Sequence, residues 1–182
     1  LDDLDALYAG DHPGFIPRFD RVVLDPSRGI AVIEPLSARG AELPRVAPGG
    51  MGRPRRFVFT TGQPEERNVP FFSSLQRLDT EGTDVVARDF YPDLPGEPII
   101  VPDGDGEEGF VLSVVYRAEA HRSALLILRT EDLSTVAELP LPHHVPPGFH
   151  GNWVPRHELD AGNQPGQGGG SMSRSTSNPS AS

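Results

Sequence analysis

The sequence predicts an all-β protein, on three observations. Apolar residues alternate with polar ones wherever they cluster, which is typical of strands with one covered face. No window of about a dozen residues carries the i, i+3, i+4, i+7 apolar pattern of an amphipathic helix. Proline occurs 20 times in 182 residues, too often for a long helix. We therefore expect strands joined by turns along the folded part of the chain.

A weak internal repeat gives these strands an order. It consists of three units, each a strand, a turn and a second strand. The first strands and their turns are Phe19–Asp25 with Pro26–Gly29, Leu75–Asp79 with Thr80–Gly82, and Leu126–Arg129 with Thr130–Leu133. The units begin about 50 residues apart, close to the roughly 40 to 50 residues of a four-stranded propeller blade. The repeat favours a β-propeller over a β-sandwich, in which turns recur about every 8–12 residues.

About three blades cannot close a ring, because an open arc leaves two apolar blade faces in contact with water. We therefore expect the chain to be part of a longer one or to assemble with copies of itself. Residues 158–182 contain no aromatic residue and are dominated by Gly, Ser, Asn, Gln and Pro. This predicts a β domain over residues 1–157 and a disordered Gly/Ser-rich tail over residues 158–182.

Two further strands are expected in the second half of the chain. Alternation places four apolar residues on one face of the first strand and two on one face of the second. These residues are Phe110, Leu112, Val114 and Tyr116, and then Leu125 and Ile127.

The segment Asp103–Glu108 has acidic residues at the first, third and fifth positions, as a calcium-binding loop does. It departs from that pattern further on, because Glu108 replaces the glycine at position six and Val114 replaces the glutamate at position twelve. We expect a solvated acidic turn that leads into the strand Gly109–Tyr116.

Composition excludes several classes of function. The formal net charge is −10 and all 16 cationic residues are Arg, so the chain offers no basic stripe to a nucleic acid. The absence of Cys excludes disulfides, Cys-based metal centres and thiol nucleophiles. The longest apolar run, Ala124–Leu128, is five residues long, far below the roughly 20 of a transmembrane helix. We expect no nucleic-acid partner and no transmembrane segment.

Sequence motifs of several enzyme classes are absent. The chain has no nucleophile elbow, no Walker loop and no dinucleotide-binding fingerprint. Its 26 acidic residues offer many pairs, so a propeller glycosidase that uses two carboxylates is retained as an alternative.

The segment Leu139–Trp153 contains the candidate functional histidine. Four prolines predict an extended path, and Gly148 and Gly151 flank Phe149 and His150, which allows a close approach to a partner. From the residues alone, a hydrogen-bonded His is commoner than a metal ligand. The other histidines are expected at a polar strand end or in loops and on the surface; these are His143 and His144, and His12, His121 and His157.

Four ordered motifs between about Asp20 and Pro155 resemble the carotenoid cleavage oxygenase family. That family includes apocarotenoid and lignostilbene dioxygenases and the retinoid isomerase of the pigment epithelium. The motifs are Glu42–Val46 followed by Gly52–Pro54, Gly96–Pro102, Gly109–Tyr116 with Ser123–Leu128, and Gly148–Pro155. The resemblance implies a seven-bladed β-propeller that holds one ferrous ion through four His, with three Glu orienting the imidazoles.

On the matching positions, His150 is the fourth iron ligand, and Glu42 and Glu97 are two of the orienting glutamates. A carboxylate on one ring nitrogen of a ligand His fixes its tautomer and raises its basicity. For Glu42 and Glu97 taken alone, an exposed strand-end carboxylate is the commoner case. An all-His ligand set suits a chain without Cys.

The remaining three His and one Glu of the family pattern lie further upstream than the 41 residues that precede Glu42 here. His12 lies too close to Glu42 to fit. The resemblance therefore implies the C-terminal part of an Fe2+-dependent dioxygenase, inactive alone, that cleaves a conjugated double bond of a carotenoid or apocarotenoid with O2. The alternative is a non-catalytic propeller module or a decayed paralogue.

Two expectations concern the surroundings of the complete protein. The expected substrate is an apolar polyene, and peripheral membrane contact through regions outside this chain stays open. A chain without Cys or a usable glycosylation site favours the cytoplasm or a plastid over secretion.

Overall fold

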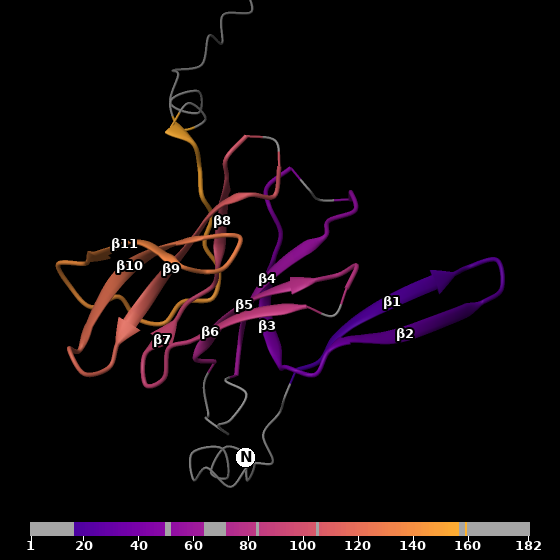
Figure 1. Cartoon of the computed structure of the whole chain (residues 1–182), viewed down its shortest axis with the longest axis horizontal. Coiled ribbons are helices and arrows are strands. Elements are labelled where there is room, and N and C mark those ends of the chain that lie inside the picture. The colour runs from indigo at the N-terminus through magenta and orange to yellow at the C-terminus, as the bar shows by residue number, and fades with distance from the viewer. Residues whose placement is uncertain are drawn as a thin grey trace, which may run out of the picture.

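The computed structural model describes residues 17–49, 52–63, 72–82, 84–104, 106–156 and 159, which form three antiparallel sheets. The first is the hairpin of β1 (Phe19–Asp25) and β2 (Ile30–Ser37). The second, in the order β3-β4-β5-β6, consists of β3 (Ala41–Arg45), β4 (Phe57–Gly62), β5 (Ser74–Asp79) and β6 (Val85–Asp89). The third consists of β7 (Leu94–Pro95), β8 (Ile99–Pro102), β9 (Gly109–Arg117), β10 (Arg122–Arg129) and β11 (Thr135–Pro140). Figure 1 shows the three sheets following one another across the molecule.

The predicted all-β architecture is confirmed, and so are the three repeated hairpins. Each predicted turn joins two antiparallel strands, namely β1 with β2, β5 with β6, and β10 with β11. The second and third sheets each form by pairing strands that are neighbours along the chain, and β7 and β8 both pair with β9. Local pairing of this kind is the feature that the repeat predicted.

The core lies between the second and third sheets. Phe59 and Leu75 of the second sheet join Val111, Val115 and Leu126 of the third in one buried cluster. Burial of apolar side chains at this junction removes them from water and stabilises the two sheets as one unit. This unit, together with the segment that follows β11, holds Glu42, Glu97 and His150, the residues that the sequence marked as candidates for the site.

The buried faces of β9 and β10 are the opposite of those carrying the predicted apolar stripes. Val111 and Val115 are fully buried, whereas Val114 of the predicted stripe is 37% exposed. On β10, Leu126 and Leu128 are buried while Leu125 and Ile127 are only partly covered. Both strands carry apolar residues on both faces, so alternation alone does not tell which face packs in the core.

The acidic turn joins β8 to β9, as expected, and is closed by a hydrogen bond from Asp103 N to Glu108 O at 2.9 Å. Asp105 lies outside the described residues. The expectation of a solvated turn is confirmed except at Glu107, which is only partly exposed. Its carboxylate accepts hydrogen bonds from the backbone N–H groups of Arg56 and Phe57 at 3.3 and 3.4 Å. The turn therefore ties the third sheet to the start of β4.

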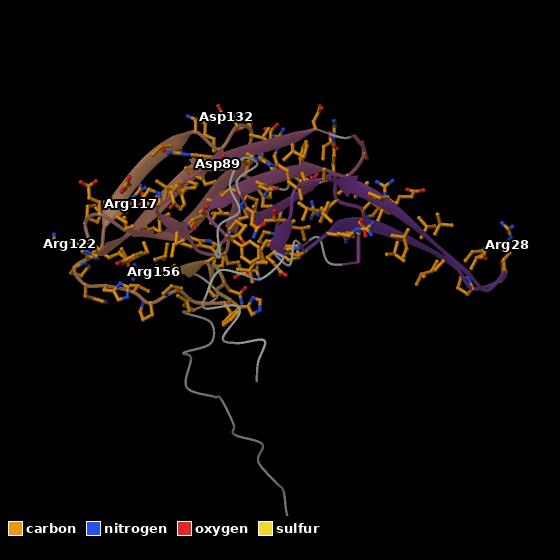
Figure 2. The ribbon with its side chains drawn as sticks, turned by 90° about the horizontal axis from the view of Figure 1, so that it is seen from below. Arg28, Asp89, Arg117, Arg122, Asp132 and Arg156 are labelled. Atoms are coloured by element: carbon orange, nitrogen blue, oxygen red, sulfur yellow. The ribbon has the colours of Figure 1, made fainter. Side chains whose placement is uncertain are left out.

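The β1–β2 hairpin projects from the rest of the molecule (Figure 1). Its apolar side chains remain exposed, including Leu24 at 69% and Ile33 at 60%. A hydrogen bond from the Arg21 guanidinium to the Thr80 carbonyl links it to the second sheet. Figure 2 shows Arg28 at the tip of the hairpin, at the opposite end of the molecule from Arg122.

Two predictions concern residues that lie mostly outside the described part of the chain. The predicted tail over residues 158–182, apart from residue 159, lies outside the described residues, as do His12 and His157. Among the residues that the structure describes, no helix is long and apolar enough to cross a membrane.

Candidate functional site

Glu97 lies in the short connection between β7 and β8 and is held there by β9. The residue before it, Gly96, donates its N–H to Val114 O and accepts a hydrogen bond from Ser113 Oγ, both at 2.9 Å. A Cβ at Gly96 would lie 3.1 Å from the Val114 carbonyl oxygen, so a glycine permits this close approach. Only 5% of the Glu97 side chain is exposed. The carboxylate is therefore a rigid, buried acceptor.

His150 comes from the extended segment that follows β11. Its Nδ1 lies 3.1 Å from Glu97 Oε1, and the next backbone N–H, of Gly151, donates to Glu97 Oε2 at 2.8 Å. A Cβ at Gly151 would lie 3.0 Å from Ile99 Cδ1, so the segment runs closely over β8. One carboxylate thus binds both the imidazole and the backbone next to it.

This geometry fixes how His150 is presented. A carboxylate accepts hydrogen bonds, so the imidazole donates its Nδ1–H to Glu97, and Nε2 is the ring nitrogen left to bind a metal. The imidazole side chain is 73% exposed, in contrast to the buried carboxylate. A neutral His whose Nδ1–H is bound by a carboxylate has the electronic arrangement of a metal ligand through Nε2.

Glu42 lies on β3 at a β-bulge. Glu42 pairs with Thr61 and Arg45 pairs with Phe59. The two β3 residues are three positions apart and their β4 partners only two, so β3 contains one extra residue. Within the bulge, Leu43 has φ 52°, a conformation that is rare for a residue with a branched side chain. Thr61 and Phe59 are two residues apart on one strand, so Glu42 and Arg45 opposite them share a face of the sheet.

The structure does not bring Glu42 to His150. The Glu42 carboxylate accepts a weak hydrogen bond from Leu43 N at 3.4 Å, and within the described chain no His contacts it. The iron-binding role of His150 and the orienting roles of Glu42 and Glu97 stay predictions.

Arg45 is the residue at this site that the sequence did not single out. Its Nη1 lies 3.6 Å from Glu97 Oε1, and its Nη2 donates to Gly151 O at 3.1 Å and to Asn152 Oδ1 at 2.7 Å. Arg45 lies inside the motif Glu42–Val46, but the family resemblance assigned a role only to the glutamate of that motif. Its contacts with Gly151 and Asn152 join residues 106 and 107 positions apart, and such contacts leave no periodic pattern in the sequence.

His150 fits a metal as one imidazole donor, and the described residues supply no complete site. Among them, no group of three or more His, Asp or Glu is placed to hold a metal ion together. His121 accepts or donates one hydrogen bond with Tyr116 Oη at 2.9 Å, and His144 packs edge-on against the Tyr116 ring. His121, His143 and His144 are all exposed.

The fold and the motif residues define a member of one family. Residues 5–155 match the model of the family described as "Retinal pigment epithelial membrane protein", and the chain belongs to this family. The resemblance predicted from the four motifs is confirmed.

Curated relatives carry names of carotenoid-cleaving enzymes. Apocarotenoid-15,15'-oxygenase of Synechocystis sp. is 33% identical over 148 residues, which are 78% of this chain and 30% of that protein. The chloroplastic 9-cis-epoxycarotenoid dioxygenase NCED1 of Oryza sativa is 31% identical over 80% of this chain and 24% of its own length. The carotenoid cleavage oxygenase of Mycobacterium tuberculosis is 30% identical over 76% of this chain and 29% of its own length. The chain therefore spans less than a third of these relatives.

Solved structures agree with the sequence relatives. A chimera of the Synechocystis apocarotenoid oxygenase and RPE65 superposes with a TM-score of 0.71 and 32% identity, over 76% of this chain and 30% of that one. The cobalt-substituted Synechocystis enzyme gives the same TM-score, identity and coverage. A structure with a substituted metal shows that this relative binds a metal ion.

Proposed function

We propose that this chain forms the C-terminal part of an Fe2+-dependent dioxygenase that cleaves a conjugated double bond of a carotenoid or apocarotenoid. In this proposal residues 1–157 make up about three blades of a seven-bladed propeller, and the rest of the ring comes from sequence outside this chain. The names of the relatives and their greater length support the proposal.

The observation that carries the proposal is the pair of Glu97 and His150. An exposed imidazole whose Nδ1 meets a buried carboxylate at 3.1 Å is held in one orientation, with Nε2 directed away from that carboxylate and open to a metal. An ordinary surface histidine needs no such buried acceptor. Imidazole is also a suitable ligand for ferrous iron in a chain without Cys.

Iron, when bound, would supply the activation of O2. The overall reaction balances without a further reductant, because one double bond and one O2 molecule give two carbonyl groups. In this chain His150 would donate its Nε2 lone pair, and Glu97 would hold the proton on Nδ1. Glu42 would hold an imidazole that comes from outside the described residues.

The proposed substrate and the proposed cellular location rest on the names of the relatives. An apolar polyene needs an apolar approach to the metal. Phe149, next to His150, is 78% exposed, and Trp153 of the same segment is 49% exposed. Two plant relatives are named as chloroplastic, which supports a plastid as one of two proposed locations, the other being the cytoplasm.

The test is His150→Ala in the complete protein that contains this chain. We expect the iron content, measured by elemental analysis, to fall to background and carotenoid cleavage to stop. His144→Ala is the matched control, because His144 lies in the same extended segment and packs on Tyr116 rather than on Glu97. Undiminished iron in the His150 variant would contradict the proposal and leave a binding or vestigial propeller module.

A further inference from the structure

We propose that Arg45 is a positioning residue that clamps the His150 segment and the Glu97 carboxylate together, so that His150 Nε2 is held ready for the metal. The inference rests on the proposed function and deepens it. It concerns a residue on a different sheet from Glu97, reached by a contact that joins three separate parts of the chain.

One guanidinium makes all three contacts. Nη1 faces Glu97 Oε1 at 3.6 Å, on the same oxygen that binds His150 Nδ1. Nη2 donates to the Gly151 carbonyl at 3.1 Å and to the Asn152 side chain at 2.7 Å. Arg45 therefore holds the carbonyl of Gly151, while Glu97 holds the N–H of the same residue.

The positive charge of Arg45 compensates the negative charge of the buried Glu97 carboxylate. A carboxylate that is 5% exposed loses most of its hydration, and an unpaired buried charge is costly. The guanidinium balances this charge, and its planar fork also donates in fixed directions. A Lys could balance the charge but could not reproduce the donors to Gly151 O and Asn152 Oδ1 with the same geometry.

The β3 bulge explains why Arg45 can reach the segment. In a regular strand, Glu42 and Arg45 would point to opposite faces, because they are three positions apart. The extra residue in the bulge, with Leu43 at φ 52°, places both opposite one face of β4. The same distortion that positions Glu42 thus directs Arg45 toward Glu97.

The experiment uses the metal-free complete protein with three variants: Arg45→Met, Arg45→Lys and Arg117→Met. Arg117 is the matched control, because its side chain is 24% exposed against 30% for Arg45, and it also binds carboxylates, those of Asp93 and Glu138. It contacts neither Glu97 nor the segment of His150. Two quantities are measured, hydrogen exchange of the peptide that contains Gly151 and the affinity for Co2+ followed by its visible absorption.

In Arg45→Met we expect exchange at Gly151 to rise about tenfold, the size of one lost net hydrogen-bond contribution. We expect Co2+ affinity to fall about 10–100-fold, as for other residues that orient ligands. Arg45→Lys should lie between the parent and Arg45→Met in both measurements, and Arg117→Met should match the parent in both.

Parent-like exchange and Co2+ affinity in Arg45→Met would overturn the inference while the proposed function stands. Faster exchange with unchanged Co2+ affinity would also overturn it, because Arg45 would then serve the fold alone. If the unsubstituted protein binds no Co2+, the proposed function fails together with the role of Arg45 toward a metal. Loss of Co2+ affinity in Arg45→Met but not in Arg117→Met, with faster exchange at Gly151, supports the inference.

Discussion

Glu97 and Glu42 were both predicted to orient an iron-binding imidazole, but the structure gives the two glutamates different surroundings. Glu97 sits in a short connection between two strands, 5% exposed, and binds both the His150 imidazole and the Gly151 N–H. Glu42 sits on a bulged strand, is only partly buried, and receives a weak hydrogen bond from its neighbour Leu43. The chain therefore contains the histidine partner of one glutamate, whereas a partner for the other would come from outside the described residues.

The largest effect that tests this contrast is expected from Glu97→Gln set against Glu42→Gln. In the metal-free complete protein, Glu97→Gln should speed hydrogen exchange at Gly151, because an amide accepts more weakly than a carboxylate. Glu42→Gln should leave that exchange unchanged. Iron affinity should fall about 10–100-fold in Glu97→Gln, the usual cost of losing an orienting partner. Equal exchange at Gly151 in the two variants would show that the two glutamates are not separated as the structure indicates.

A second effect concerns the strand that carries Glu42. Gly62 of β4 pairs with Ala41, beside Glu42, and a Cβ there would lie 1.6 Å from Gln76 Nε2 and 2.5 Å from the Gly40 carbonyl oxygen. Gly62→Ala should lower the free energy of unfolding by about 1–3 kcal/mol, the usual cost of overpacking. Hydrogen exchange should increase along β3 more than at Gly151.

The control for this variant is Gly148→Ala, since a Cβ at Gly148 meets no atom within 4 Å. It should stay within about 0.5 kcal/mol of the parent in urea unfolding, as most surface substitutions do. Equal stability of the two variants would mean that β4 can move away from Gln76 at no cost.

The sequence predicted the fold more completely than it predicted the site. Alternating residues and turn residues predicted the strands and the three hairpins because both signals are local. The same alternation could not identify the core face of β9, because Phe110 and Val111 are both apolar and only tertiary packing buries one of them fully. Local patterns therefore specify that a strand forms and leave open what covers it.

The site shows the same limit. The motifs identified Glu97 and His150, which are 53 positions apart, and their contact at 3.1 Å follows only from the path of the chain over β8. Arg45 was missed because an arginine in a strand is ordinary. Its contacts with Glu97 and Gly151 depend on the β3 bulge, which no residue type in the sequence predicts. The hydrogen bonds that Glu107 accepts at the start of β4 were also missed, because they join residues 50 and 51 positions apart along the chain.

The smallest expected effect concerns Asp79, a buried carboxylate that binds Arg56 and contacts no His among the described residues. The hydrogen bonds from Arg56, at 2.8 to 3.1 Å, lower the pKa of Asp79 from 3.8 to about 2. Since the pKa is lower in the folded state, ionised Asp79 stabilises the fold above pH 3.8, and this contribution is lost as the pH falls through about 2. Asp79→Asn should therefore be less stable than the parent in urea at neutral pH, and the difference should disappear near pH 2. A difference that persists unchanged in acid would show that Asn disturbs packing, and the Arg56–Asp79 pair would then be no guide to how charge acts between Arg45 and Glu97.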